Sequence, residues 1–265
     1  RDPRVVGLAG TYTTIADGIF SVGYNPALIG FQQDKPFQLQ LFGFDAGVIG
    51  NFISFETLSE YSGDTLYTAD KDKLFLEFQD AGGLTFFQDF HLPIPVLNFA
   101  YENLAFTSNA IFLANYKLPI GLLELMMYGN ADKPELDMTL GYEMLGINEY
   151  GVTFAVPFKN LSFGATVKYL QGLFYFGIDS DSSSATLITD DLGLYGSGKY
   201  LIRQGFGGAG LGLDIGVVTQ EFDGWAFGAS LINAKGNITW NKTLKKDEGG
   251  PGISIPGIYP FTWQG

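Results

Sequence analysis

The strongest constraint on the fold is a two-residue alternation of apolar with small or polar residues between positions 138 and 176. Apolar residues hold the even positions over 138–144 and 150–158, and then the odd positions of a return segment that begins at Leu161, after a turn at Lys159-Asn160. Because successive side chains of a β-strand point to opposite faces, this pattern predicts two long antiparallel strands. The return strand is expected to keep its odd-numbered apolar residues, as far as Leu173 and Tyr175, on one face.

The opposite face decides between two all-β architectures. It carries Gly, Ser and Thr with scattered charges such as Glu143, Lys168 and Asp214, whereas a soluble sandwich usually covers its solvent face with Lys and Glu. Charged residues make up 16% of the chain, below the roughly 25% of soluble domains, and aromatic residues 15%. We therefore predict an all-β fold, an antiparallel transmembrane β-barrel with an N-terminal plug and short helices. A soluble β-sandwich is the alternative.

This prediction assigns a side to each residue, since a slip of one residue would exchange the two faces. A lysine at the middle of a bilayer costs about 2–4 kcal/mol, so charges should point inward and aromatic residues toward lipid. We expect lipid or an apolar partner at Leu161, Phe163, Val167, Leu211, Leu213, Ile215, Trp225 and Phe227, and an inward direction for Gly164, Thr166, Lys168, Gly212 and Asp214.

The remaining segments predict shorter elements. Two of them favour helices: 68–80, with Thr68 as its cap and Leu74, Phe75 and Phe78 on one face, and 118–128, which is too short to span a bilayer. The other expected elements are a strand at 36–47, a hairpin of 84–101 with 104–116 around Glu102-Asn103, a polar loop at 179–185, and a tight turn at Asp223-Gly224.

Several functional classes are disfavoured. The net charge of −13 argues against a nucleic-acid partner, and the absence of Cys excludes thiolate sites and disulfides. His91 is the only histidine and lies two residues from Asp89, but the sequence assigns no nucleophile to this pair, so we expect no enzyme. Asp179 and Asp181 could bind calcium, although a solvated loop is the expected reading. No cofactor or metal is predicted.

The first part of the chain differs from the rest, because it is rich in Gly and ends on Asn25-Pro26-Ala27-Leu28. Pro26 lacks a backbone donor and disfavours a helical Asn25, which predicts compact irregular structure rather than a strand. We divide the chain into a plug at 1–35 and a barrel wall at 36–265. The plug resembles the N-terminal hatch of the outer-membrane long-chain fatty-acid transporter family, and the residues that carry this resemblance are Gly10, Ala16, Asp17, Asn25, Pro26, Ala27 and Leu28.

Further segments extend the resemblance over most of the chain. They are 66–74, 81–84, 118–125, 129–130, 167–173, 211–216 and 236–240. Together they are similar to an uncharacterised outer-membrane barrel family of Bacteroidetes-type bacteria within the fatty-acid-transporter-like superfamily, which also includes a barrel protein of type IX secretion. The resemblance implies more strands than the sequence supplies, so the wall is expected to be incomplete at its C-terminal end.

The resemblance implies a location in the outer membrane of a Gram-negative bacterium. The leading expectation is a passive channel for hydrophobic small molecules such as fatty acids, with an exit near Asn25-Pro26-Ala27. The alternative is a structural or accessory barrel that anchors or shuttles a secreted or surface protein complex. The expected partners are outer-membrane lipids, a hydrophobic molecule or lipid inside the barrel and, for the alternative, that protein complex.

Overall fold

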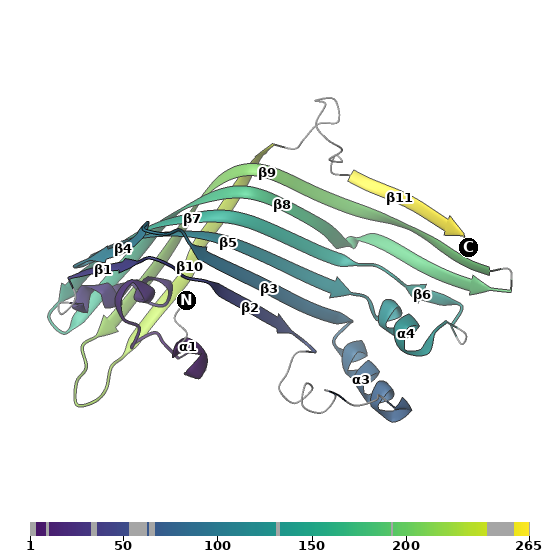
Figure 1. Ribbon diagram of the computed structural model, residues 1–265, viewed down its shortest axis with the longest axis horizontal. Coiled ribbons are helices and arrows are strands. Elements are labelled where there is room, and N and C mark those ends of the chain that lie inside the picture. Colours follow the sequence, from purple (N-terminus) through teal and green to yellow (C-terminus); the bar gives the residue numbers. More distant parts are fainter. Residues whose placement is uncertain are drawn as a thin grey trace.

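The computed structural model describes residues 4–8, 11–32, 36–52, 63, 67–130, 133–191, 193–242 and 257–264. An antiparallel sheet of 11 strands dominates these residues, as the alternation predicts (Figure 1). Its main path runs β1-β4-β5-β7-β8-β9-β10, while β3 joins β2 to β5, β6 pairs with β8, and β11 pairs with β9. The strands are β1 (Phe37–Gln40), β2 (Asp45–Gly50), β3 (Leu84–Pro93), β4 (Asn98–Tyr101), β5 (Leu104–Leu118), β6 (Glu135–Asp137), β7 (Gly141–Phe158), β8 (Leu161–Asp190), β9 (Gly193–Thr219), β10 (Gly228–Lys242) and β11 (Gly257–Gln264).

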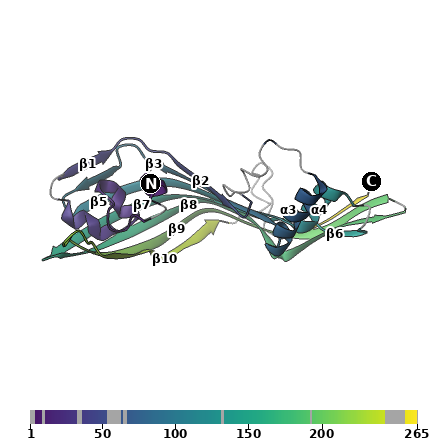
Figure 2. The ribbon, with the colours of Figure 1, turned by 90° about the horizontal axis from the view of Figure 1, so that it is seen from below.

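The described strands do not close into a barrel, since β10 pairs only with β9 and β2 only with β3. The sheet instead curves at one end around the N-terminal segment, by which we mean residues 4–8 and 11–32 (Figure 2). This segment contains the helical turns α1 (Arg4–Gly7), η1 (Gly18–Gly23) and η2 (Pro26–Phe31). It packs through η1 on β1, β4 and β5, and through η2 on β7, β8 and β9.

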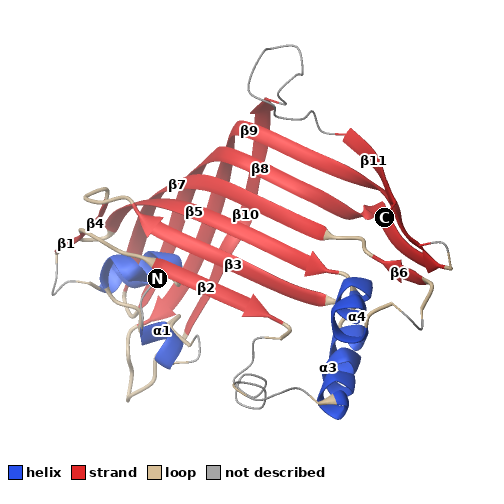
Figure 3. Ribbon diagram, turned by 45° about the vertical axis from the view of Figure 1, so that its right-hand side comes forward, coloured by secondary structure: helices blue, strands red, loops and turns tan. Residues whose placement is uncertain are grey.

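Two helices lie near the other end of the sheet, α3 (Thr68–Asp80) and α4 (Ile120–Tyr128) (Figure 3). Both were predicted from the sequence. Their shared core contains Leu74, Phe78 and Leu123. The cap of α3 differs from the prediction: Tyr67 holds the N-cap position instead of Thr68, and the Asp70 carboxylate accepts a hydrogen bond from the Tyr67 amide at 3.0 Å. No described helix has the length and apolar character needed to cross a membrane.

The predicted faces of the long strands are confirmed by burial. Residues expected outside, such as Phe163, Val167 and Leu211, are 51%, 57% and 61% exposed, whereas Thr166 and Asp214 are 0% and Lys168 is 6% exposed. Leu213 is half-buried. The exception is Tyr175. Leu173 forms a bulge and has no partner in the ladder, so beyond it the odd-numbered residues of β8 point inward. The Tyr175 hydroxyl accordingly donates to the inward-facing Glu143 at 2.9 Å.

Three local predictions are wrong. The polar loop at 179–185 lies inside β8, where the ladder is irregular between Asp179 and Ser184 and Asp179 forms an ion pair with Arg203. The strand at 36–47 divides into β1 and β2. The strand at 84–101 divides at Ile94–Leu97, because the buried Asn98 side chain bonds the backbone of Ile94 and Ser108 and so stabilises a loop there.

The predicted turns are confirmed in position. The β4–β5 hairpin turns at Glu102-Asn103, and the chain reverses between β7 and β8 at Lys159-Asn160. At Asp223-Gly224 both residues have positive φ, 48° and 82°, which is the geometry of a tight hairpin turn.

Candidate functional site

Asn25 fixes the N-terminal segment to the sheet. The side chain is completely buried, and its Nδ2 donates to the carbonyl oxygens of Thr13 and Val217, both at 3.1 Å. Its Oδ1 accepts from the Ala27 amide at 3.1 Å and thereby caps η2. Asn25 therefore joins the start of the segment, its helical turn and strand β9 in one network. Pro26 follows at the first position of η2, where its missing N–H costs nothing.

A row of small residues on the sheet receives Asn25-Pro26-Ala27. The ladder places Ala155, Gly164, Gly216 and Ser230 side by side on β7, β8, β9 and β10. A Cβ at Gly164 would overlap the backbone of Pro26 and Ala27, and one at Gly216 would overlap the Asn25 side chain. These contacts explain why the inward face is rich in glycine: the backbone of the segment occupies the space.

Two hydroxyl groups complete this contact. Ser162 Oγ donates to the carbonyl oxygen of Ala27, and Ser230 Oγ donates to that of Tyr24, both at 2.6 Å. Of the residues that carried the sequence resemblance, Asn25, Pro26 and Ala27 lie at this contact. Ala16 and Leu28 pack in a neighbouring buried cluster with Val218, and Asp17 precedes η1. Gly10 lies outside the described residues.

A buried ionic cluster lies on the same face of the sheet. Lys168 Nζ is 2.8 Å from Asp214 Oδ2 and 3.3 Å from Glu149 Oε2, and it donates to Asn233 Oδ1 at 3.0 Å. Three different strands, β7, β8 and β9, supply the charged groups. Charges this deep are retained only when they are paired and hydrogen-bonded, so the cluster depends on the strand register.

A bulge in β10 supplies the fourth member of the cluster. The register with β9 shifts between Leu231 and Lys235, and Asn233 adopts a positive φ of 56° within this interval. Its amide donates to Asp214 Oδ1 at 2.7 Å while its side chain accepts from Lys168. Asparagine is one of the few residues other than glycine that adopt this left-handed conformation readily, which suits it to this position in the bulge.

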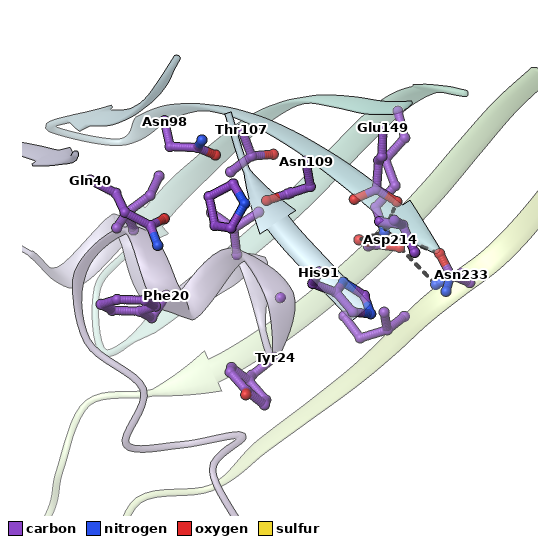
Figure 4. A pocket seen from close by; sticks show the side chains of 17 residues that line it. Phe20, Tyr24, Gln40, His91, Asn98, Thr107, Asn109, Glu149, Asp214 and Asn233 are labelled. Atoms are coloured by element: carbon purple, nitrogen blue, oxygen red, sulfur yellow. Dashed lines mark hydrogen bonds and ion pairs between the residues drawn. The ribbon is translucent and has the colours of Figure 1, made fainter. Parts of the chain in front are cut away.

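A cavity of about 260 Å³ separates the ionic cluster from the N-terminal segment (Figure 4). In this view Phe20 and Tyr24 lie on one side and Glu149, Asp214 and Asn233 on the other. The apolar residues Ile19, Val22, Ile111 and Ile232 line it together with the polar Gln40, Thr107 and Asn109. This combination of one charged end and several apolar walls is typical of a small-molecule site.

Residues 26–255 match the family of unknown function DUF5723. The chain belongs to this family. No curated protein and no solved structure matches it. The match to DUF5723 begins at Pro26 and therefore includes the row of small residues and the whole ionic cluster. Most of the N-terminal segment, including Asn25, precedes it.

The Asp89–His91 pair reaches the cavity through His91. The His91 Nε2 atom lies 3.3 Å from Asp89 Oδ2, and Asp89 is buried. His91 lines the cavity together with Lys168 and Glu149. Within the described ranges, no group of three or more His, Cys, Asp or Glu side chains is arranged to hold a metal ion.

Sequence reasoning missed two parts of this site. Lys168 and Asp214 were placed on the inward face, but their contact with each other and with Glu149 depends on the pairing of β7, β8 and β9. Asn233 was not predicted to be functional, because its role depends on a bulge in β10 for which the sequence contains no recognisable signal. The Asn25-Pro26-Ala27 segment was found through its resemblance, and the structure adds the row of small residues that receives it.

Proposed function

We propose that this chain forms wall strands of a β-barrel in the outer membrane of a Gram-negative bacterium, with residues 1–35 as its plug. Together they make a passive path for hydrophobic small molecules, and fatty acids are the class that the resemblance suggests. We also propose that the chain is a member of the fatty-acid-transporter-like superfamily. The proposed function includes no enzymatic step.

The exposed outer face of the long strands carries the proposal. Val152, Phe154, Phe163, Val167 and Leu211 are all about half exposed or more, and their ladder neighbours make the surface continuous across β7, β8 and β9. Contiguous apolar surfaces of this kind are rare on soluble monomers and are expected where a strand faces lipid. The buried charges lie on the other side of the same strands, as a barrel interior requires.

The proposed path runs beside the N-terminal segment. The cavity between Phe20 and the ionic cluster gives a molecule a place on the inner side of the sheet, next to the proposed plug. Irregular backbone is tolerated at membrane depth only where protein or a cavity shelters it, and the small-residue row shelters Asn25-Pro26-Ala27.

Uptake of a labelled fatty acid by cells that produce the full-length protein tests this proposal. Deletion of residues 4–30 and the substitution Pro26→Ala should both change the uptake rate, because each alters the contact of the segment with β8 and β9. Pro134→Ala is the matched control, since Pro134 is exposed and precedes β6, far from this contact in the sequence. Unchanged uptake in both altered proteins, with normal insertion, would overturn the proposal.

The length of β8 and β9 favours a second candidate, an accessory barrel that anchors or shuttles a surface or secreted protein complex. These strands contain 30 and 27 residues, whereas about 9–11 residues cross a bilayer. The hairpin therefore extends far beyond the lipid and offers a docking surface. Purification from native membranes separates the two candidates: stoichiometric protein partners favour the accessory role, and bound lipid favours transport.

A further inference from the structure

We propose that the cavity beside Lys168 binds the head group of an amphipathic molecule that carries an ammonium group, in preference to a fatty-acid carboxylate. This inference rests on the proposed path for hydrophobic small molecules and, among them, favours those with an ammonium group over the fatty acids that the resemblance suggests. It concerns the charge that the cavity accepts, which neither the resemblance nor the family assigns.

Lys168 is already surrounded by partners from the protein itself. Its Nζ donates a hydrogen bond to Asn233 Oδ1 at 3.0 Å and forms ion pairs with Asp214 and Glu149 at 2.8 and 3.3 Å. The Lys168 side chain is only 8% exposed, so it cannot turn to a new partner without breaking this cluster. A carboxylate in the cavity would have to displace one of the protein's own acceptors.

The charge around the cavity opposes an anion and favours a cation. The carboxylates of Glu149, Asp214 and Asp89 face the cations Lys168 and, when protonated, His91. When the three carboxylates are ionised and His91 is neutral, they outnumber the cations and the sum of these charges is negative. Because these groups are largely removed from water, the attraction of an ammonium group and the repulsion of a carboxylate are both stronger than at an exposed surface.

Glu149 is the residue placed to receive the ammonium group. It contacts Lys168 through Oε2 and lines the cavity, and among the described residues its Oε1 accepts no hydrogen bond. The apolar tail of the ligand would contact the apolar lining, to which Ile19, Phe20 and Val22 of the N-terminal segment and Ile232 contribute. The cavity volume of about 260 Å³ fits a short-chain molecule.

Binding of three probes of equal chain length tests the inference: octylammonium, octanol and octanoate. Each is titrated by calorimetry at neutral pH into the full-length protein in lipid nanodiscs, with empty nanodiscs as the partition control, and in parallel into the protein in detergent. We expect octylammonium to bind about tenfold more tightly than octanoate, because one charge-assisted hydrogen bond forms and one repulsion is avoided.

Glu149→Gln keeps the size of the side chain and removes its charge, and it should bring the ratio of octylammonium to octanoate affinities close to one. Glu143→Gln is the matched control, because Glu143 lies on the same face of β7, bonds Tyr175 and does not line the cavity. This control should keep the ratio of the unaltered protein.

Octanoate binding as tightly as octylammonium would overturn the inference, and so would an unchanged ratio in Glu149→Gln or no binding beyond that of the empty nanodisc. Insertion into nanodiscs and fatty-acid uptake are measured separately. A chain that inserts but binds no probe refutes only this inference. A chain that fails to insert refutes the proposed function, and the titration in detergent still reports on the cavity.

Discussion

Lys168 shows how a single residue depends on its neighbours in this fold. The sequence places it at the centre of a strand, where an unpaired charge would be very costly. Its three partners, two carboxylates and one amide oxygen, come from β7, β9 and the bulge in β10, so the ammonium group is fully paired only when all four strands pair correctly. The cluster therefore contributes to strand register as well as to the cavity.

Substitution of Lys168 by Met should destabilise the protein by about 3–5 kcal/mol, since it leaves Asp214 and Glu149 buried without a counter-charge. The free energy of unfolding in denaturant, measured with the protein in lipid vesicles, reports this loss. Lys159→Met is the control, because Lys159 is exposed in the β7–β8 turn and should change the free energy by less than about 0.5 kcal/mol. Equal effects of the two substitutions would contradict our account of the cluster.

At the scale of elements, the contact between the N-terminal segment and the sheet reverses the usual preferences of strands. Valine normally fits a strand better than glycine. Gly164 and Gly216 lie within the ladder of β8 and β9, yet a side chain at either would occupy the place of Asn25-Pro26-Ala27. The position of the segment therefore determines these residues, rather than the requirements of the strands that contain them.

Gly164→Val should release the N-terminal segment at a cost of about 1–3 kcal/mol, the usual range for an overpacked contact. Hydrogen exchange of the amides in residues 11–32 measures the release. The matched control is Gly236→Val on β10, because a Cβ there meets no atom within 4 Å and the backbone has no positive φ. Equal protection of the segment in both variants would show that the glycine row does not hold it.

At the scale of the whole molecule, the proposal divides the sheet into a part within the bilayer and a part beyond it. Val167 and Ser197 are both exposed in the isolated chain, so burial by protein does not distinguish them. Val167 lies six residues after the start of β8 at Leu161, whereas Ser197 lies near the far turn between β8 and β9. The two positions would therefore differ in their access to water only if Val167 faces lipid and Ser197 does not.

The chain has no Cys, so single cysteines report this division directly. In native membranes, a water-soluble maleimide should modify Val167→Cys about tenfold more slowly than Ser197→Cys, because the hydrocarbon region excludes water and the reagent. In denaturant both should react at similar rates, which controls for intrinsic reactivity. Similar rates in the membrane would contradict the assignment of this face to lipid.

The sequence alone determined the faces of the long strands, because a side-chain period of two is a property of the extended backbone and needs no tertiary contact. It also determined the turn at Asp223-Gly224 and the helices α3 and α4, whose signals are local. Tertiary structure decided where this local pattern fails. The bulge at Leu173 turns Tyr175 inward, and the continuous β8–β9 ladder draws the polar residues 179–185 into a strand.

The candidate site follows the same division. The inward direction of Lys168 and Asp214 was predictable from period and charge, but their meeting with Glu149 and Asn233 was not, since these residues are far apart in the chain and only the strand register brings them together. The row of small residues is likewise explained by the N-terminal segment that packs on it and not by the strands that contain it. A sequence states which side a residue faces, whereas the pairing of distant strands decides what it meets there.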